Sequence, residues 1–291
     1  MFVSGFTIAR NVVRADYPLK EAVYSILPLC DEFVIAVGKS EDNTLEFVQS
    51  FDDPKIRIIE TVWDDNLREG GRVLADETNK AKTAVSKQAD WLFYIQADEC
   101  LHEKYHSRIH KCMLENLSNS QVDGLLFDYV HFYGSHDYIG DSRKWYRKEI
   151  RVVRNNPDIY SYRDAQGFRK GNDLKLNVAH TGASIYHYGW VKHPREQQIK
   201  QQQFHRMWHS DEKLKTIVQP SDEFNYSAVD SLTHFHGTHP DVLRNRIEKQ
   251  NWSFDHDISK KNFTLKTRLL YFIEKLTGIR IGEYKNYRLR K

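Results

Sequence analysis

The chain has 291 residues, a formal net charge of +3 and an aromatic content of 13%. This length is enough for one large α/β domain or two small ones with a sizeable core. The small net charge gives no argument for nucleic acid as a partner, and we expect none. The charge is uneven, because residues 241–291 hold 13 Lys/Arg and 6 Asp/Glu (13 − 6 = +7), whereas residues 1–240 hold 30 and 34 (30 − 34 = −4).

Cysteine usage and hydropathy indicate the compartment. Cys30, Cys100 and Cys112 occur without a CxxC pair, which is typical of a reducing compartment and argues against a disulfide framework or zinc knuckle. No signal-peptide pattern opens the chain, and no apolar run approaches the roughly 20 residues that span a bilayer. We therefore expect a cytoplasmic protein, either soluble or peripheral at the inner face of the cell membrane.

The first 100 residues alternate between strand and helix patterns. Helices are predicted over 18–30, 40–51 and 70–89, and strands over 2–9, 32–38, 55–63 and 90–99. This order predicts a parallel sheet with helices on both faces. Ligands of such sheets bind at the carboxyl ends of the strands. Polar residues stand at these ends, at 10–11, 38–40, 63–65 and 96–99.

The second part of the chain is less regular. Its apolar runs predict strands over 122–135, 148–155 and 182–191. Helical spacing predicts helices over 194–215, 239–252 and 264–278. The sequence shows no repeat, low-complexity tract or clear linker, so we expect both parts to share one core.

The apolar run "DWLFYIQADE" (90–99) ends in two adjacent acids, Asp98 and Glu99. One interpretation is that they only cap the next segment. The other is that a carboxylate at the strand end coordinates Mg²⁺ or Mn²⁺, which would neutralise the charge of a bound diphosphate. The residues alone leave both interpretations open.

Four motifs in one order carry a resemblance to a known family. They are "TIARN" (7–11), "SEDNT" (40–44), "GRVLADETNKA" (71–81) and "YIQADE" (94–99). Together they resemble glycosyltransferase family 2, in particular the enzymes of bacterial polysaccharide and lipopolysaccharide synthesis. The resemblance implies the α/β GT-A fold, a mixed and mostly parallel sheet flanked by helices. It also implies a catalytic domain over 1–235, with a nucleotide-sugar half (1–105) and an acceptor half (106–235), and a helical basic extension over 236–291 packed on that domain.

The resemblance implies roles for individual residues. Asp98 and His187 are the expected ligands of Mg²⁺ or Mn²⁺; a histidine held in an aromatic wall is the alternative for His187. The residues expected to bind the nucleotide sugar are Thr7, Ala9, Arg10, Asn11, Ser40, Asp42, Arg72, Asn79, Gln96 and Ala97. For Asp42 a helix-cap role is an equal alternative.

The chain departs from the family pattern at two places. Gln96 stands where the family usually has an acid, so the site has one carboxylate fewer. Val37 and Gly38 stand where an acid usually reads the nucleotide base. The donor is therefore expected to be a UDP, GDP or dTDP sugar, without a choice among them.

An inverting transfer needs a general base that takes the proton of the acceptor hydroxyl. By resemblance Asp164 fills this place, with Asp173 as the second candidate and Asp128 as the third. A surface ion pair with Arg163 is the alternative for Asp164. The cluster His234, His236 and His239 has no Cys or Asp at zinc spacing, which argues against a separate zinc site.

The C-terminal segment 264–291 mixes apolar and basic residues. One helical face fits Leu265, Leu269, Phe272, Ile273 and Leu276. This face would either pack on the domain or dock on an anionic membrane that carries a lipid-linked acceptor.

Taken together, the residues and the resemblance predict a hexosyltransferase-like enzyme that moves a sugar from a nucleotide diphosphate sugar to a saccharide hydroxyl. We expect inversion, metal dependence and a role in surface polysaccharide synthesis. The alternatives are a glycan-binding or scaffolding protein with a decayed site and, less favoured, a sugar nucleotidyltransferase.

Overall fold

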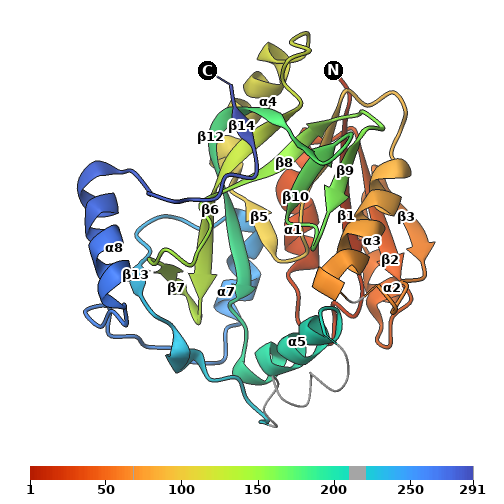
Figure 1. Cartoon of the computed structure of the whole chain (residues 1–291). Coiled ribbons are helices and arrows are strands. Elements are labelled where there is room, and N and C mark those ends of the chain that lie inside the picture. Colours follow the sequence, from red (N-terminus) through yellow and green to blue (C-terminus); the bar gives the residue numbers. More distant parts are fainter. Residues whose placement is uncertain (68, 210–220, 291) are drawn as a thin grey trace.

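The computed structural model describes residues 1–67, 69–209 and 221–290 (Figure 1). One half of its large sheet is parallel. Its strands lie in the order β3 (Ile56–Thr61), β2 (Glu32–Gly38), β1 (Val3–Ala9) and β4 (Trp91–Tyr94). These are the four predicted strands of the first 100 residues. Their carboxyl ends therefore lie at one edge of the sheet.

The other half of the sheet is mainly antiparallel. It continues from β4 through β8 (Lys148–Arg154), β6 (Gly124–Tyr133), β7 (Ser135–Gly140) and β13 (Leu232–His234). The long strand β12 (Asn177–Trp190) runs parallel to β6 and to β14 (Arg288–Leu289), and antiparallel to β5 (Glu99–Leu101). The expected mixed α/β sheet flanked by helices, in the GT-A and Rossmann-like manner, is confirmed.

Alternation along the strands supplies two cores, one on each face. On one face Phe33, Ile35 and Val37 join α1 (Leu19–Ile26), α2 (Thr44–Gln49) and α4 (His106–Glu115). On the other face Val34 and Ala36 join α3 (Arg72–Thr83). Because both faces are covered, the strands read as continuous apolar runs, which is why the sequence predicts them well.

A small second sheet packs on the face of α3. It consists of β9 (Ile159–Tyr162), β10 (Gly167–Lys170) and β11 (Leu174–Lys175). The ring of Phe168 lies 5.8 Å from that of Tyr94 and 6.5 Å from that of Phe6, centroid to centroid. The turn between β9 and β10 is thereby held beside the end of β4.

The remaining helices are α5 (Pro194–Arg206), α7 (Arg244–Glu248) and α8 (Leu265–Thr277). The helix expected over 194–215 ends at Arg206, and residues 210–215 lie outside the described part of the chain. The helix expected over 239–252 is a 3₁₀ turn, η5 (Asp241–Leu243), followed by α7. The other 3₁₀ turns are η1 (Leu27–Leu29), η2 (Glu69–Gly71), η3 (Glu103–Tyr105) and η4 (Tyr226–Ala228).

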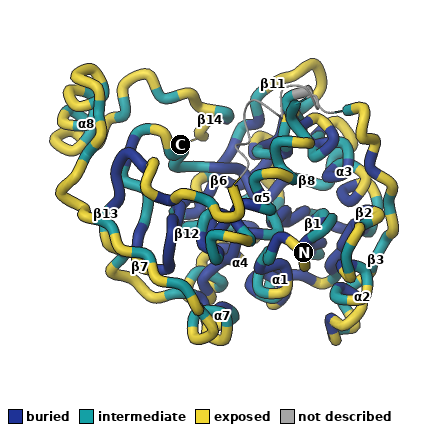
Figure 2. The backbone as a smooth tube through the Cα atoms, turned by 90° about the horizontal axis from the view of Figure 1, so that it is seen from below, coloured by how far each residue is buried: buried dark blue, intermediate teal, exposed yellow. Residues whose placement is uncertain are grey.

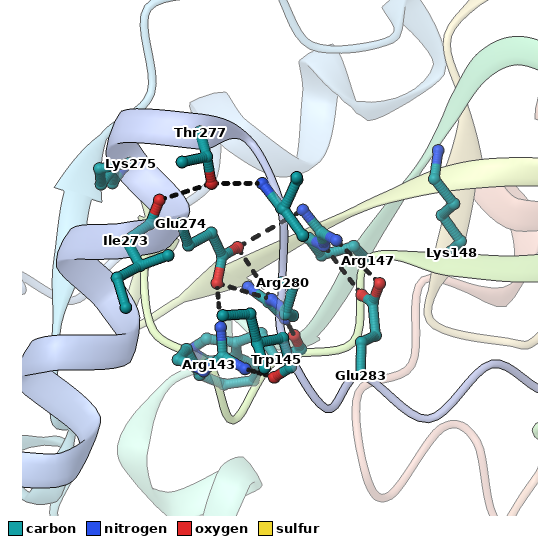
Figure 3. A network of polar contacts seen from close by, with 12 residues as sticks. Arg143, Trp145, Arg147, Lys148, Ile273, Glu274, Lys275, Thr277, Arg280 and Glu283 are labelled. Carbon is teal, nitrogen blue, oxygen red and sulfur yellow. Dashed lines mark hydrogen bonds and ion pairs between the residues drawn. The ribbon is translucent and has the colours of Figure 1, made fainter.

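The helix α8 is held by its polar side. Glu274 pairs with Arg143 (2.6 Å), Arg147 (3.4 Å) and Arg280 (2.8 Å), as Figure 3 shows. Glu283, beyond the helix, pairs with Arg147 at 2.8 Å. These ion pairs fix the C-terminal segment to the loop that follows β7.

The apolar side of α8 faces away from the protein. Its stripe of Leu265, Leu269, Phe272 and Leu276 is 86%, 61%, 64% and 75% exposed, and Figure 2 shows the helix as largely exposed. Of the two expectations for this face, packing on the domain is wrong for these four residues. None of the described helices has the length and apolar character needed to cross a bilayer.

Candidate functional site

A cleft of about 740 Å³ opens at the carboxyl ends of β1, β3 and β4. One wall is the helix α5, which lies below the sheet in Figure 1. Of the predicted site residues, those that line the cleft are Arg10, Asn11, Gln96, Ala97, Asp98, Asp164 and His187. These residues come from four segments that are far apart in the sequence, and the fold brings them to one place.

Asp98 is the centre of the polar contacts in the cleft. Its Oδ2 accepts a hydrogen bond from Lys200 Nζ at 2.9 Å and lies 3.6 Å from His187 Nε2. Burial would raise the pKa of this carboxyl, but the charges of Lys200 and His187 hold it well below its usual range. Asp98 therefore carries a negative charge that is already matched by a lysine.

Gly189 makes room for this arrangement. A Cβ atom at position 189 would lie 2.6 Å from both Asp98 Oδ2 and His187 Nε2. The "HYG" segment of β12 thus supplies His187 and, two residues later, the space in which its imidazole meets Asp98. This gives the glycine a physical reason that the sequence alone did not show.

The fit of a divalent metal can be judged from these contacts. Asp98 and His187 are near enough to share an ion, but Lys200 Nζ already donates to the same Asp98 oxygen at 2.9 Å and to the Gly189 carbonyl at 2.7 Å. Within the described residues, no group of three or more His, Cys, Asp or Glu could hold a metal. Two ligands with an ammonium beside them do not form a complete metal site.

Asp164 lies at the tip of a strained turn. Its neighbours Arg163 and Ala165 have φ angles of 54° and 60°, in the left-handed region that non-glycine residues rarely adopt. Burial raises the pKa of the Asp164 carboxyl. A partly buried carboxylate that lines the cleft from the β9–β10 turn has the properties of a general base.

The other two base candidates lie outside the cleft. Asp173 has a side chain that is 73% exposed and pairs with Arg169 at 3.3 Å. Asp128 forms ion pairs with Lys148 and His180. Only Asp164 among the three lines the cavity.

The end of β1 is tied to the end of β2 by side chains from the predicted motifs. Asn11 N donates to Ser40 Oγ at 3.1 Å, and Asn11 Oδ1 accepts from Glu41 N at 2.7 Å. Asp42 accepts from the backbone N–H groups of Thr44 at 3.0 Å and Arg14 at 2.7 Å. Asp42 therefore makes the contact expected of a residue at the start of a helix. Of Asn11, Ser40 and Asp42, only Asn11 lines the cleft.

Four further predicted residues do not line the cleft. Thr7 is buried and donates to the Ile95 carbonyl at 2.6 Å, and Ala9 is buried in the core. Arg72 is exposed at the start of α3. Asn79 bonds the backbone of Ser161 with both ends of its amide, at 2.7 and 3.0 Å. Their observed contacts are structural.

Trp63 packs against the end of β2. Its indole packs on Gly38, where a Cβ would lie 2.2 Å from Nε1. Trp63 lines the cleft, and the guanidinium of Arg10 lies 5.4 Å from its ring centroid and pairs with Asp65 at 2.9 Å. Trp63 and Arg10 thus occupy the side of the cleft where the family pattern would have an acid.

Several cleft residues were not predicted from the sequence. Lys200 is one of them. On α5 it shares a face with Gln197 and Phe204. The helical spacing after the segment His187-Tyr188-Gly189 could therefore have indicated it. Tyr17 also lines the cleft, and its ring centroid lies 5.1 Å from Lys200 Nζ and 4.6 Å from Lys192 Nζ. Lys192 is fully buried behind the cleft lining. Burial lowers the pKa of Lys192 to about 7. No local pattern indicated Tyr17 or Lys192.

A second cavity of about 350 Å³ adjoins the cleft. It shares His131, Trp145 and Tyr146 with the cleft and extends to Tyr271 and Lys275 of α8. Burial holds the pKa of His131 well below its usual range, so this imidazole is neutral. The shared residues join the strand-end cleft to the C-terminal segment.

The histidine cluster expected not to bind zinc is dispersed among aromatic contacts. His239 Nδ1 lies 2.9 Å from the hydroxyl of Tyr188, and His234 packs on the ring of Tyr138 at 4.8 Å.

The chain was compared with known proteins. No family model matches it, and no curated protein matches it. S. aureus TarS in complex with UDP is 14% identical over 70% of this chain and 64% of its own, with a TM-score of 0.42. Glucosyl-3-phosphoglycerate synthase from Mycobacterium tuberculosis, solved with Mn²⁺, UDP and glucosyl-3-phosphoglycerate, is 16% identical over 46% of this chain and 45% of its own, with a TM-score of 0.31.

A third solved structure is 4-diphosphocytidyl-2C-methyl-D-erythritol synthase from Anaerococcus prevotii. It is 10% identical over 53% of this chain and 70% of its own, with a TM-score of 0.34. This chain spans only 39% of the longer TarS structure. Similarities of this size do not assign an activity.

Proposed function

We propose that this chain is a glycosyltransferase that binds a nucleotide diphosphate sugar in the strand-end cleft and transfers the sugar to a saccharide hydroxyl. One observation carries the proposal. Asp98, His187 and Asp164 come from three distant segments and line a single cavity at the carboxyl ends of parallel strands. Nucleotides bind at this edge in open α/β sheets.

The proposed transfer step depends on the carboxylate of Asp164. Asp164 takes the proton of the acceptor hydroxyl, and the acceptor oxygen forms a bond to the anomeric carbon from the face opposite the diphosphate. The bond from that carbon to the phosphate oxygen breaks, so the nucleoside diphosphate leaves with the electron pair and the sugar is inverted. The raised pKa of Asp164 suits this role, because a stronger base accepts the proton more readily.

The donor end of the cleft is assigned to Arg10, Asn11, Gln96 and Ala97. Arg10 offers a charge for the diphosphate, and Gln96 can hydrogen-bond a ribose. A Mg²⁺ or Mn²⁺ ion would be held by Asp98 and His187 only with Lys200 displaced from Asp98, and it would then supply positive charge for the leaving diphosphate. The residues at the donor end do not distinguish among UDP, GDP and dTDP sugars as donors.

The body of the acceptor is assigned to the second cavity, which the aromatic rings of Trp145, Tyr146 and Tyr271 help to line, and its reacting hydroxyl to the strand-end cleft that Asp164 lines. Sugars pack their apolar faces on such rings. This cavity reaches α8, whose exposed apolar stripe adjoins exposed basic residues at Lys266 and Arg268. An apolar stripe with basic neighbours fits an anionic membrane surface, and thus a lipid-linked saccharide in surface polysaccharide synthesis at the inner face of the membrane.

The test is a thermal-shift panel of UDP, GDP and dTDP sugars, followed by transfer assays with the donor that binds. The proposal expects one nucleotide class to raise the melting temperature, with the shift reduced in Asp98→Asn. If no donor raises it, the rival of a decayed glycan-binding or scaffolding protein gains support. Lys200 on Asp98 and Gln96 in place of an acid are the observations that favour this rival.

A further inference from the structure

The polar centre of the cleft already holds a cation. Lys200 extends from α5 to Asp98, and its Nζ lies 2.9 Å from Oδ2 and 2.7 Å from the Gly189 carbonyl. The side chains of Lys200 and Asp98 are only 10% and 11% exposed. The ring of Tyr17 covers the ammonium at 5.1 Å. The ion pair between Lys200 and Asp98 is therefore buried and is not a surface ion pair.

The ammonium bonds the same carboxylate oxygen that a divalent ion would need. Such an ion would bind the same Oδ2 of Asp98 and Nε2 of His187, which are 3.6 Å apart. Gly189 leaves open the space where these groups meet. Within the described residues, no group of three or more His, Cys, Asp or Glu side chains could hold a metal there. A divalent cation placed beside the ammonium would therefore meet strong repulsion at low local dielectric.

We propose that Lys200 is the resident cation of this site, so that its ammonium and a divalent ion are alternative occupants beside Asp98. The native chain then binds a nucleoside diphosphate without added metal, because the ammonium supplies a point charge to the phosphates. A metal binds only when Lys200 is displaced. The nucleotide part of this inference rests on the proposed function; the competition between lysine and metal does not.

The first experiment measures Mn²⁺ binding without any nucleotide, by calorimetry and by the electron paramagnetic resonance signal of free Mn²⁺. Lys200→Met is expected to bind Mn²⁺ at least tenfold more tightly than the native chain. Lys200→Arg keeps the charge and should bind as the native chain does. Adding Asp98→Asn to Lys200→Met should remove the gain. Lys144→Met removes a lysine from the same cleft, away from Asp98, and should leave Mn²⁺ binding unchanged.

Equal Mn²⁺ affinity of the native chain and Lys200→Met would overturn the proposal. The second experiment needs no variant, so it decides even if Lys200→Met does not fold. UDP, GDP and dTDP are titrated into the native protein in EDTA and in Mn²⁺. The proposal expects the affinity of the bound nucleotide to differ by less than threefold between the two conditions. A loss of tenfold or more in EDTA would overturn it.

The two proposals can fail separately. If no nucleotide binds in either condition, the proposed function is wrong, and the Mn²⁺ comparison of native, Lys200→Met and Lys200→Arg chains still decides the role of Lys200. If a nucleotide binds only with Mn²⁺, the proposed function stands and the resident-cation proposal is wrong.

Discussion

The Glu99 carboxylate and the Arg151 guanidinium form a bidentate ion pair that is fully buried. Arg151 Nε lies 2.8 Å from Oε2, and Nη2 lies 2.5 Å from Oε1. The preceding residue, Asp98, faces the cleft instead. The two adjacent acids at the end of "DWLFYIQADE" therefore have different partners, one inside the protein and one in the cleft.

Glu99→Gln is expected to lower the free energy of unfolding by about 3–5 kcal/mol, because it leaves a buried guanidinium without its counter-charge. Urea denaturation at pH 7 measures the change. Asp173→Asn is the matched control, since it removes an exposed ion pair with Arg169 and should cost less than about 1 kcal/mol. Equal effects of the two substitutions would show that the buried pair does not stabilise the fold.

Asp164→Asn is expected to reduce the transfer rate about 10²–10⁴-fold, the usual contribution of a general base. In the native chain kcat/KM should rise with pH through a pKa above the ordinary aspartate value of 3.8, because burial raises the pKa of Asp164. This acidic limb should be absent from the residual activity of the variant. A limb that persists in Asp164→Asn would assign the titrating group elsewhere.

Glu149→Gln is expected to stabilise the protein at neutral and higher pH. Burial raises the pKa of Glu149 from 4.5 to about 8, and its Oε2 has no hydrogen-bond partner among the residues that the structure describes. The folded chain holds this proton more tightly than the unfolded chain. The stability that the protonated Glu149 carboxyl contributes is therefore fully present below pH 4.5 and is lost as the pH rises to 8.

The stability difference between Glu149→Gln and the native chain should therefore grow by about 1.4 kcal/mol per pH unit between these limits and stay constant above pH 8. Denaturant unfolding at pH 5, 6, 7 and 8 measures it. A constant difference across this series would contradict the raised pKa.

Gly189→Ala is expected to disturb the cleft more than the fold. The new Cβ would lie 2.6 Å from Asp98 Oδ2 and His187 Nε2, so one of the two side chains must move. The stability cost should be about 1–3 kcal/mol, as for other overpacked sites. Calorimetric titration should show at least a tenfold loss of nucleoside diphosphate affinity. If the folded variant binds the nucleoside diphosphate as tightly as the native chain does, Gly189 is not part of the binding site.

The double substitution Leu269→Ser and Phe272→Ser is expected to reduce binding to phosphatidylglycerol vesicles at least tenfold without lowering stability. Both side chains are largely exposed on α8 and contribute little to the core. Leu114→Ser in α4, where the leucine is 47% exposed, is the control for a general loss of surface hydrophobicity. If the native chain instead self-associates through this stripe, analytical sedimentation will show a dimer that dissociates in the double substitution. That result would show the membrane assignment to be wrong.

Local patterns predicted the parallel half of the sheet well. The strand 32–38 is a continuous apolar run because both faces of the sheet are covered there, and such runs are legible in the sequence. The short strands β7, β10, β11, β13 and β14 and the helix α4 were not predicted. Short elements of this kind are set mainly by pairing and packing with distant residues, which leave little local periodicity.

The sequence by itself determined the alternation of strands and helices and the polar strand ends that line the cleft, because these depend on neighbouring residues. Only the tertiary structure decided which charges meet there. Lys200 reaches Asp98 across 102 positions of sequence. Arg143 holds Glu274 across 131 positions, and this turns the apolar stripe of α8 outward. Such pairs depend on the packing of whole elements, so a sequence pattern does not contain them.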